Sequence, residues 1–274
     1  MADLAVVLVT HQSAAALAGC LAELPRRGVA EVVVVDNASL DDSAALARGH
    51  GAQVIESPVN RGFAWAANRG AETARAPVLC FLNPDCRPTA AALEAAVEAV
   101  SRGGLICAAP ALDEGDTVVA GRQPGYTGIK LLADVLETSW GDSSLVRRLR
   151  RRPGHDDRSW WWAHGACLVM LRDGFLGLGG FDEGYMLYME DVDLGRRLSA
   201  AGGRVVGLEV RVRHARSGSS VVSDEIRRRL LVQGRLRYAA NHHGRLFAAG
   251  LRLLAAPSEP VRRAVGPRRP KERS

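Results

Sequence analysis

The sequence has 274 residues, of which 47% are hydrophobic and 24% charged, and a net charge of +6; this composition is ordinary for a globular chain with room for one large core. Its five cysteines form no C-x-x-C pair, which argues against a zinc site or a disulfide framework and for a reducing compartment. No apolar stretch approaches the roughly 18 residues of a membrane-spanning helix, and we expect no signal peptide.

Short apolar runs, typical of parallel strands buried on both faces, recur along the first 110 residues. They lie at 4–9, 32–35, 54–56, 78–82 and 106–109. Helices are expected between them: one capped by Ser13, one that opens at 41–43 and ends near 49–51, one over 62–74, and one that runs from a Thr89 cap to Ser101. This alternation predicts an α/β fold with a mostly parallel, doubly wound central sheet flanked by helices. Ligands of such sheets bind beyond the carboxyl ends of the strands.

After residue 110 the alternation ends. We expect loops and one arginine-bearing helix over 113–160, a strand over 160–171, a helix over 190–201, a strand over 205–212 and an amphipathic helix over 225–241. The chain is thereby divided into a main domain (1–224), an amphipathic helical extension (225–256) and a basic, disordered tail (257–274). Positive charge gathers at 147–152 and 262–273. Such runs can meet nucleic acid, an anionic membrane surface or a phosphorylated substrate, and the alternative is a solvated loop and tail.

The second predicted strand ends at Asp36. A carboxylate there can accept hydrogen bonds from a ribose hydroxyl or a base N–H, and the alternative is a helix-capping or turn aspartate. The first strand ends at Thr10-His11 with no G-x-G-x-x-G behind it, and the chain has no G-x-x-x-x-G-K-[ST]. A dinucleotide-binding Rossmann domain is therefore disfavoured, and a P-loop enzyme is excluded.

Two further segments suit a diphosphate and its cation. Asn60-Arg61-Gly62 opens a helix, where glycine permits close backbone approach, the helix N-terminus favours phosphate and Arg61 adds a charge-assisted contact. Asp85, in Asn83-Pro84-Asp85, follows a buried strand and can hold Mg²⁺ or Mn²⁺. Both segments are also common turn sequences, so ordinary turns are the alternative.

An acidic helix start and a late histidine complete the candidates. Asp191 lies in the first turn of the helix expected over 190–201, where the helix dipole stabilises a carboxylate that can act as a general base. The alternative is that Glu190, Asp191 and Asp193 are only the acidic residues that helix starts favour. His214 ends the late strand and can bind a metal or a phosphate, although a single histidine is more often structural.

Taken in order, these segments resemble family 2 glycosyltransferases with the GT-A fold, especially the rhamnosyltransferase-like members of bacterial envelope pathways. The resemblance covers residues 4–240. It is carried by Val7-Leu8-Val9-Thr10-His11, Val35-Asp36-Asn37-Ala38-Ser39, Asn60-Arg61-Gly62-Phe63, Leu82-Asn83-Pro84-Asp85, Trp162-Ala163-His164-Gly165-Ala166-Cys167, Gly180-Phe181-Asp182-Glu183 and Met189-Glu190-Asp191-Val192-Asp193-Leu194.

The resemblance implies a role for each candidate within a GT-A catalytic domain over residues 1–224. Asp191 is the implied catalytic base, and Asp85 and His214 are the implied ligands of Mg²⁺ or Mn²⁺. The implied donor site consists of Thr10, His11, Asp36, Asn37, Asn60, Arg61, Gly62 and Asn83, and the implied acceptor site of Trp162, His164, Gly165, Tyr188 and Glu190. Asn83 stands where the family's metal-binding D-x-D motif has its first acid. We therefore expect low metal affinity, partly supplied by the diphosphate.

By the same resemblance, the reaction is an inverting transfer of L-rhamnose from dTDP-L-rhamnose to a polyprenyl-diphosphate-linked N-acetylglucosamine; a UDP-sugar donor acting on another envelope polysaccharide is the alternative. A sugar nucleotidyltransferase is disfavoured because residues 10–13 offer no glycine-rich phosphate loop, and a non-catalytic binding protein because Glu190-Asp191 is retained. We expect a cytoplasmic protein, peripheral on the inner face of the cell membrane, whose basic runs meet anionic lipid and which has no nucleic-acid partner.

Overall fold

The computed structural model describes residues 3–215 and 223–255, which fall into two compact units. The sheet unit consists of residues 3–125 and 158–215, and the helical unit of residues 126–157 and 223–255. The expected boundary at 224/225 lies beside the start of α9 (Asp224–His242). Residues 126–157, which the sequence assigned to the catalytic domain, group with that helix instead. The predicted tail, 257–274, lies outside the described residues.

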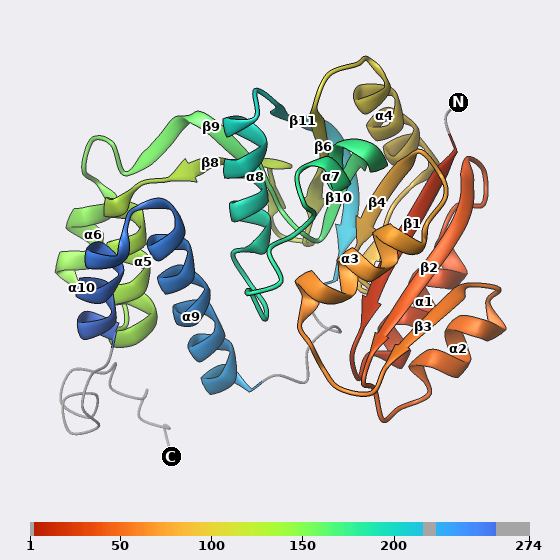
Figure 1. The fold of residues 1–274 in the computed structure, drawn as a ribbon, viewed down its shortest axis with the longest axis horizontal. Helices are drawn as coiled ribbons and strands as arrows, with labels where there is room; N and C mark the ends of the chain where they lie inside the picture. Colours follow the sequence, from red (N-terminus) through yellow and green to blue (C-terminus); the bar gives the residue numbers. More distant parts are fainter. Residues whose placement is uncertain (1–2, 216–222, 256–274) are drawn as a thin grey trace. The chain divides into compact units, whose positions relative to one another are not determined.

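The sheet unit is built on a nine-stranded sheet with the order β3-β2-β1-β4-β10-β6-β11-β5, and with β7 beside β6 (Figure 1). Its strands are β1 (Leu4–Thr10), β2 (Val29–Asn37), β3 (Gln53–Ser57), β4 (Val78–Leu82), β5 (Cys86–Arg87), β6 (Ile106–Asp113), β7 (Val118–Val119), β10 (Cys167–Leu171) and β11 (Arg204–His214). The pairs β3–β2, β2–β1, β1–β4 and β6–β11 are parallel, whereas β10 is antiparallel to β4 and β6. The predicted mostly parallel sheet is confirmed.

Helices cover both faces of this sheet (Figure 1). The strands alternate their side chains between the faces, so that Leu4, Val6 and Leu8 enter one core cluster and Ala5 and Val7 the other. The first cluster is completed by α1 (Ala14–Glu23), α2 (Ser43–Gly49) and α4 (Ala90–Ser101), and the second by α3 (Phe63–Thr73), α7 (Arg172–Gly177) and α8 (Glu190–Ala200). The result is a sheet buried on both sides, as the apolar strand runs predict.

The start of α1 differs from the prediction. The Ser13 side chain caps nothing and shares a 2.7 Å hydrogen bond with the Thr10 hydroxyl. The first backbone N–H of the helix, that of Ala14, donates instead to Asp41 Oδ2 at 3.0 Å. Because Asp41 also accepts from Ser43 N–H at 3.1 Å, one carboxylate ties the start of α1 to the start of α2.

The prediction of loops and a single helix over 113–160 is wrong. This region contains β7, β8 (Arg122–Tyr126), α5 (Gly128–Trp140), α6 (Ser144–Arg150) and the start of β9 (Asp156–Ala163). The arginine run does lie largely on α6. The single strand expected over 160–171 is two strands, β9 and β10, separated by residues 164–166, and β9 pairs with β8 in a small second sheet.

In the helical unit, α5 packs against α6, α9 and α10 (Arg245–Ala255). Polar contacts reinforce this packing: Arg235 of α9 lies 3.6 Å from the Asp134 carboxylate, and Trp140 Nε1 donates to the Leu254 carbonyl at 2.8 Å. The sequence did not predict α10 as a separate helix. Among the residues that the structure describes, no helix is both long and apolar enough to cross a membrane.

One edge of the main sheet gathers the carboxyl ends of six strands. These strands run in the same direction, so the residues that follow them share this edge: β1, β2, β3, β4, β6 and β11. β10 runs the opposite way, and its first residue, Cys167, pairs with Leu82 at the end of β4. The turn at 164–166 therefore lies at the same edge.

Candidate active site

Thr10 and Asp36 are opposite each other at the ends of β1 and β2, and both are buried. The Asp36 carboxylate accepts from the Ser39 hydroxyl and, at 3.4 Å, from the Ser39 N–H. Ser39 Oγ in turn accepts from Gln12 N–H at 3.0 Å. The two strand-end loops are thus tied together by Ser39, a residue to which the sequence analysis gave no role.

Both the nitrogen and the oxygen of the Asn37 side-chain amide form hydrogen bonds with the loop before α3. Its Nδ2 donates to Asn60 Oδ1 at 2.9 Å and to the Gly62 carbonyl at 3.1 Å, and its Oδ1 accepts from Arg61 N–H at 2.9 Å. Asn60 Oδ1 also accepts from Gly62 N–H at 3.0 Å. The Arg61 guanidinium lies 5.0 Å from the centre of the Trp65 ring. Asn37 therefore holds the segment that carries Asn60, Arg61 and Gly62.

Gly62 is required at its position for two reasons. Its φ of 91° lies in the region that favours glycine, and a Cβ there would meet the Met186 carbonyl oxygen at 2.5 Å. Phe63 N–H donates to that same carbonyl at 2.9 Å. The loop before α3 is consequently seated on the loop before α8.

The Gly180-Phe181-Asp182-Glu183 segment is fixed by Asn68 of α3, which the sequence analysis did not list among the site residues. Asn68 exchanges two hydrogen bonds of 2.9 Å with the backbone of Phe181 and donates to Glu183 Oε1 at 3.1 Å. A Cβ on Gly180 would meet Asn68 Oδ1 at 2.5 Å. A buried polar residue on an otherwise alanine-rich helix face was the available signal.

Asp85 and His214 come together as predicted, with His214 Nε2 3.4 Å from Asp85 Oδ1. On the other side of the ring, His214 Nδ1 lies 3.3 Å from Glu114 Oε1. Burial lowers the pKa of His214, but Asp85 and Glu114 outweigh it, so the pKa lies above its ordinary value. Glu114 was not predicted from the sequence, although it directly follows β6, which pairs with β11 in parallel.

These buried groups fit a divalent cation. Donor atoms of Asp85, Cys86 and His214 all lie within 4.8 Å of one another. In a common type of metal site, a carboxylate and an imidazole bind the ion and a second carboxylate accepts a hydrogen bond from the other nitrogen of the imidazole. Asp85, His214 and Glu114 are arranged in this order. Cys86 is not expected to contribute, because burial raises the pKa of its thiol and the thiol donates to the Ala166 carbonyl at 3.3 Å.

Asp191, half-buried in the first turn of α8, is held by two backbone N–H groups. Gly165 donates to its Oδ2 at 2.9 Å and Val192 to its Oδ1 at 2.8 Å. Burial raises the pKa of Asp191, and the charge of His164 and these two N–H groups offset part of the effect, leaving the pKa above its ordinary value. A carboxylate in this state is oriented and more basic than one in water.

His164 connects this carboxylate to the metal-binding candidates. Its Nδ1 accepts from Ala166 N–H at 3.2 Å, and its ring centre lies 6.2 Å from that of His214. The N–H of the next residue, Gly165, donates to Asp191 Oδ2. The predicted base and the predicted metal ligands are thus two ends of one polar cluster at the sheet edge.

The three acids at the start of α8 have different surroundings. Glu190 is buried, and its Oε2 has no hydrogen-bond partner among the described residues; burial and then the charge of Asp191 raise its pKa to about 8. Asp193, also buried, forms a 2.7 Å ion pair with Arg197. Arg197 additionally donates to the carbonyls of Leu178 and Gly180, so this pair fixes the preceding loop.

The remaining acceptor candidates, Trp162 and Tyr188, lie on β9 and directly before α8. Trp162 lies on β9 with its Nε1 donating to the Pro124 carbonyl at 3.0 Å, and its ring centre is 6.2 Å from that of His164. Tyr188 and Met189 have consecutive positive φ angles of 73° and 76° directly before α8. This costly backbone conformation turns the chain into the helix that begins with Glu190 and Asp191.

Comparison with known proteins assigns the chain to a family. Residues 5–173 match the family described as Glycosyl transferase family 2. An N-acetylglucosaminyl-diphospho-decaprenol L-rhamnosyltransferase of Mycobacterium tuberculosis (strain CDC 1551 / Oshkosh) is 32% identical over 219 residues, which cover 73% of this chain and 71% of that protein.

Solved structures of glycosyltransferases share the fold. The structure of GalNAc-T7 with UDP, GalNAc and Mn²⁺ matches with a TM-score of 0.58 at 19% identity, covering 87% of this chain and 48% of the other, so the chain spans less than half of that structure. The mannosyltransferase PcManGT from Pyrobaculum calidifontis, in complex with GDP-Man and Mn²⁺, matches with a TM-score of 0.53 at 17% identity, covering 97% of this chain and 85% of the other. The sheet unit therefore has the GT-A fold, and the chain belongs to glycosyltransferase family 2.

Proposed function

We propose that this glycosyltransferase transfers L-rhamnose from dTDP-L-rhamnose to a polyprenyl-diphosphate-linked N-acetylglucosamine, with inversion at the anomeric carbon. The name of the M. tuberculosis relative supports the choice of sugar and acceptor, since that protein is 32% identical over 73% of this chain. A UDP-sugar donor for another envelope polysaccharide is the competing choice.

The observation that carries the catalytic part of the proposal is the environment of Asp191. Its carboxylate is oriented by the N–H groups of Gly165 and Val192, and its pKa is raised by burial. In the proposed reaction Asp191 takes the proton from the acceptor hydroxyl while that oxygen attacks the anomeric carbon. The bond from this carbon to the diphosphate oxygen breaks on the opposite side, and the nucleoside diphosphate leaves with the electron pair.

Asp85 and His214 would hold the cation, and Glu114 would orient the His214 ring. When bound, Mg²⁺ or Mn²⁺ supplies electrostatic stabilisation of the charge that develops on the departing diphosphate. Because Asn83 stands where the usual motif has an acid, Asp85 supplies the one carboxylate of Asn83-Pro84-Asp85. We accordingly propose a cation affinity that rises sharply once the nucleotide diphosphate is present.

The donor would lie along the carboxyl ends of β1, β2 and β4. In this proposal the buried Asp36 and Thr10 face the nucleoside, with His11, whose Nδ1 donates to the Asn37 carbonyl at 2.9 Å, beside them. The Asn37 amide supports donor binding indirectly, because its hydrogen bonds hold the loop of Asn60 to Gly62.

We also propose that the protein works in the cytoplasm at the inner face of the cell membrane, where a lipid-linked acceptor is held. Arg147, Arg148 and Arg150 on α6 supply positive charge that an anionic surface attracts. The second basic run, 262–273, lies outside the described residues.

A donor panel tests this proposal. The melting temperature of the purified protein is measured with dTDP-L-rhamnose, UDP-N-acetylglucosamine, UDP-galactose and GDP-mannose, each with and without Mn²⁺, and transfer to a short-chain polyprenyl-diphosphate N-acetylglucosamine is followed by mass spectrometry. We expect the largest stabilisation from dTDP-L-rhamnose with Mn²⁺, together with a product heavier by one deoxyhexose. Preference for a UDP-sugar would replace the donor assignment, and no stabilisation by any nucleotide-sugar would refute the proposal.

A further inference from the structure

Helix α10 exposes apolar side chains along one stripe. Leu246 and Leu253 lie on the same face, two turns apart, and their side chains are 91% and 81% exposed. Leu251, on the opposite side of the helix, is only 2% exposed and packs into the helical unit. Ala249 and Gly250 lie between the two leucines on the same exposed stripe. An amphipathic helix normally turns its leucines inward, so outward leucines two turns apart indicate a surface that contacts something apolar.

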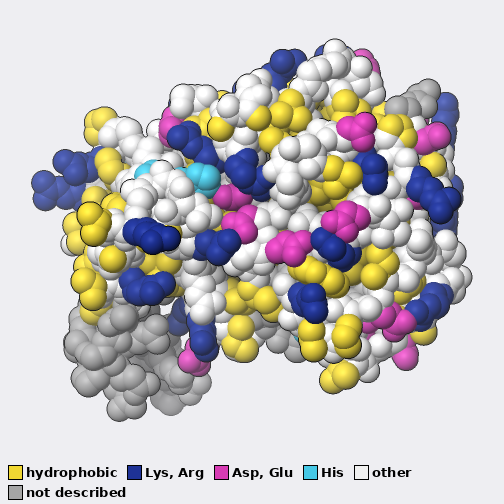
Figure 2. Space-filling model, in the orientation of Figure 1, with side chains coloured by type: hydrophobic (Ala, Val, Ile, Leu, Met, Phe, Trp, Pro, Cys, Tyr) yellow, Lys and Arg dark blue, Asp and Glu magenta, His cyan; other side chains and the backbone are white. Residues whose placement is uncertain are grey.

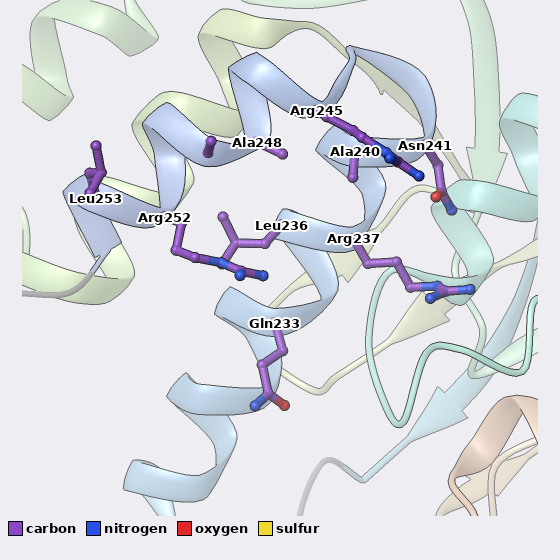
Figure 3. Close-up of a pocket in the computed structure, with 10 residues that line it drawn as sticks. Gln233, Leu236, Arg237, Ala240, Asn241, Arg245, Ala248, Arg252 and Leu253 are labelled. Atoms are coloured by element: carbon purple, nitrogen blue, oxygen red, sulfur yellow. The ribbon is translucent and has the colours of Figure 1, made fainter.

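An arginine-lined groove adjoins this stripe. The groove, about 640 Å³ in volume, lies between α9 and α10, and its walls include Arg237, Arg245 and Arg252 with apolar Leu236 and Leu253 (Figure 3). In Figure 3 the side chains of Arg237 and Arg245 extend toward the same side, from α9 and α10 respectively. Arg245 and Arg252 form no ion pair or side-chain hydrogen bond with any residue in the described part of the chain.

The charge of these two helices is strongly one-sided. Together α9 and α10 carry seven arginines, and their acidic residues are confined to Asp224 and Glu225 in the first turn of α9. Figure 2 shows hydrophobic and basic side chains next to one another on the left part of the face that it presents, where Figure 1 labels α10. Positively charged side chains beside exposed leucines are complementary to a surface with an apolar interior and anionic groups above it.

We infer that α10 is an interfacial helix that docks on an anionic bilayer, with Leu246 and Leu253 inserted at the acyl boundary and the groove arginines on lipid phosphates. Leucine insertion explains the apolar stripe, and the phosphate ligands explain why Arg245 and Arg252 lack partners among the described residues. A second copy of this chain would fit less well, because pairing the stripes would bring uncompensated arginines together. The inference goes beyond the surface attraction proposed for the basic runs and does not depend on the reaction.

The test is vesicle flotation of the full chain, without nucleotide or acceptor. Vesicles contain phosphatidylcholine alone or with phosphatidylglycerol, at low and high salt. We expect wild type to bind the anionic vesicles preferentially. Leu246→Ser and Leu253→Ser should each weaken binding about tenfold at either salt concentration. Arg245→Gln and Arg252→Gln should each weaken it about fivefold, at low salt only.

Leu40→Ser is the matched control, because Leu40 is 93% exposed on the sheet unit. It should bind vesicles like wild type, and melting temperatures should confirm that all variants are folded. Equal binding by Leu246→Ser, Leu253→Ser and Leu40→Ser would overturn the inference. So would a dimer in analytical ultracentrifugation that the α10 leucine variants dissociate, since α10 would then contact a second copy. A failed donor panel with intact vesicle binding would count against the proposed function alone.

Discussion

Replacing Gly62 by alanine should disturb the active site far more than the loss of one hydrogen atom suggests. Two costs add at this position. A φ of 91° with ψ of 165° lies in a region almost restricted to glycine, which costs an alanine about 1–3 kcal/mol. The added Cβ would lie 2.5 Å from the Met186 carbonyl oxygen, so backbone must shift, at a further cost of about 1–3 kcal/mol.

Gly51→Ala separates these two costs. Gly51 also has a positive φ, 80°, but a Cβ there meets nothing within 4 Å. Gly51→Ala therefore carries the cost of a positive φ without the clash. Gly62→Ala should melt roughly 2–12 °C below Gly51→Ala, from about 1–3 kcal/mol of additional destabilisation in a chain of this size.

The assays are thermal unfolding and hydrogen exchange of peptides that cover residues 60–63 and 185–189. We expect faster exchange in both peptides for Gly62→Ala, because Phe63 N–H donates to the Met186 carbonyl and the two loops are held together there. Donor binding should weaken in parallel. Equal melting temperatures for the two variants, with unchanged exchange at 185–189, would refute the claim that this contact holds the site in shape.

Three other perturbations have defined outcomes. Burial and then the adjacent Asp191 carboxylate raise the pKa of Glu190 from 4.5 to about 8, so between these pH values the folded chain holds a proton that the unfolded chain has released. The melting temperature should therefore fall as the pH rises from about 4.5 to about 8, and Glu190→Gln should remove this fall. Asp193→Asn should destabilise the protein by about 2–3 kcal/mol in chemical denaturation, because Arg197 loses its buried partner. Mn²⁺ should raise the melting temperature of the nucleotide-bound wild type, and His214→Asn should lose most of that increment while His50→Asn keeps it.

Local signals made much of the sheet unit predictable. The run Val78–Leu82 and the helix that ends at Ser101 were predicted to the residue, since an apolar run and a Thr89 cap define them locally. The prediction for residues 113–160 failed because the helices and strands there depend on distant partners. For example, α5 packs on α9, which lies about a hundred residues later in the chain. A signal did exist, since Thr127 caps α5 and Gly141 ends it.

The same contrast between local signals and distant contacts applies to the candidate site. Residues at strand ends could be grouped from the sequence, because parallel strands bring their carboxyl ends to one edge. The partners of those residues could not be, since Glu114 meets His214 across 100 positions and Asn68 meets Phe181 across 113. Such pairs are defined by tertiary contact, and the sequence shows only one member of each: an acidic residue after β6 and a polar residue on an alanine-rich helix.

Asp191 is the proposed base of the sugar transfer. The most direct measurement is the single-turnover rate of Asp191→Asn on a saturating donor and acceptor, beside its affinity for the donor. Asp173→Asn is the matched control, since the Asp173 side chain is fully exposed on the same unit. We predict a rate lowered by about 10²–10⁴-fold with donor affinity within about twofold of wild type. A rate like that of Asp173→Asn would contradict the claim.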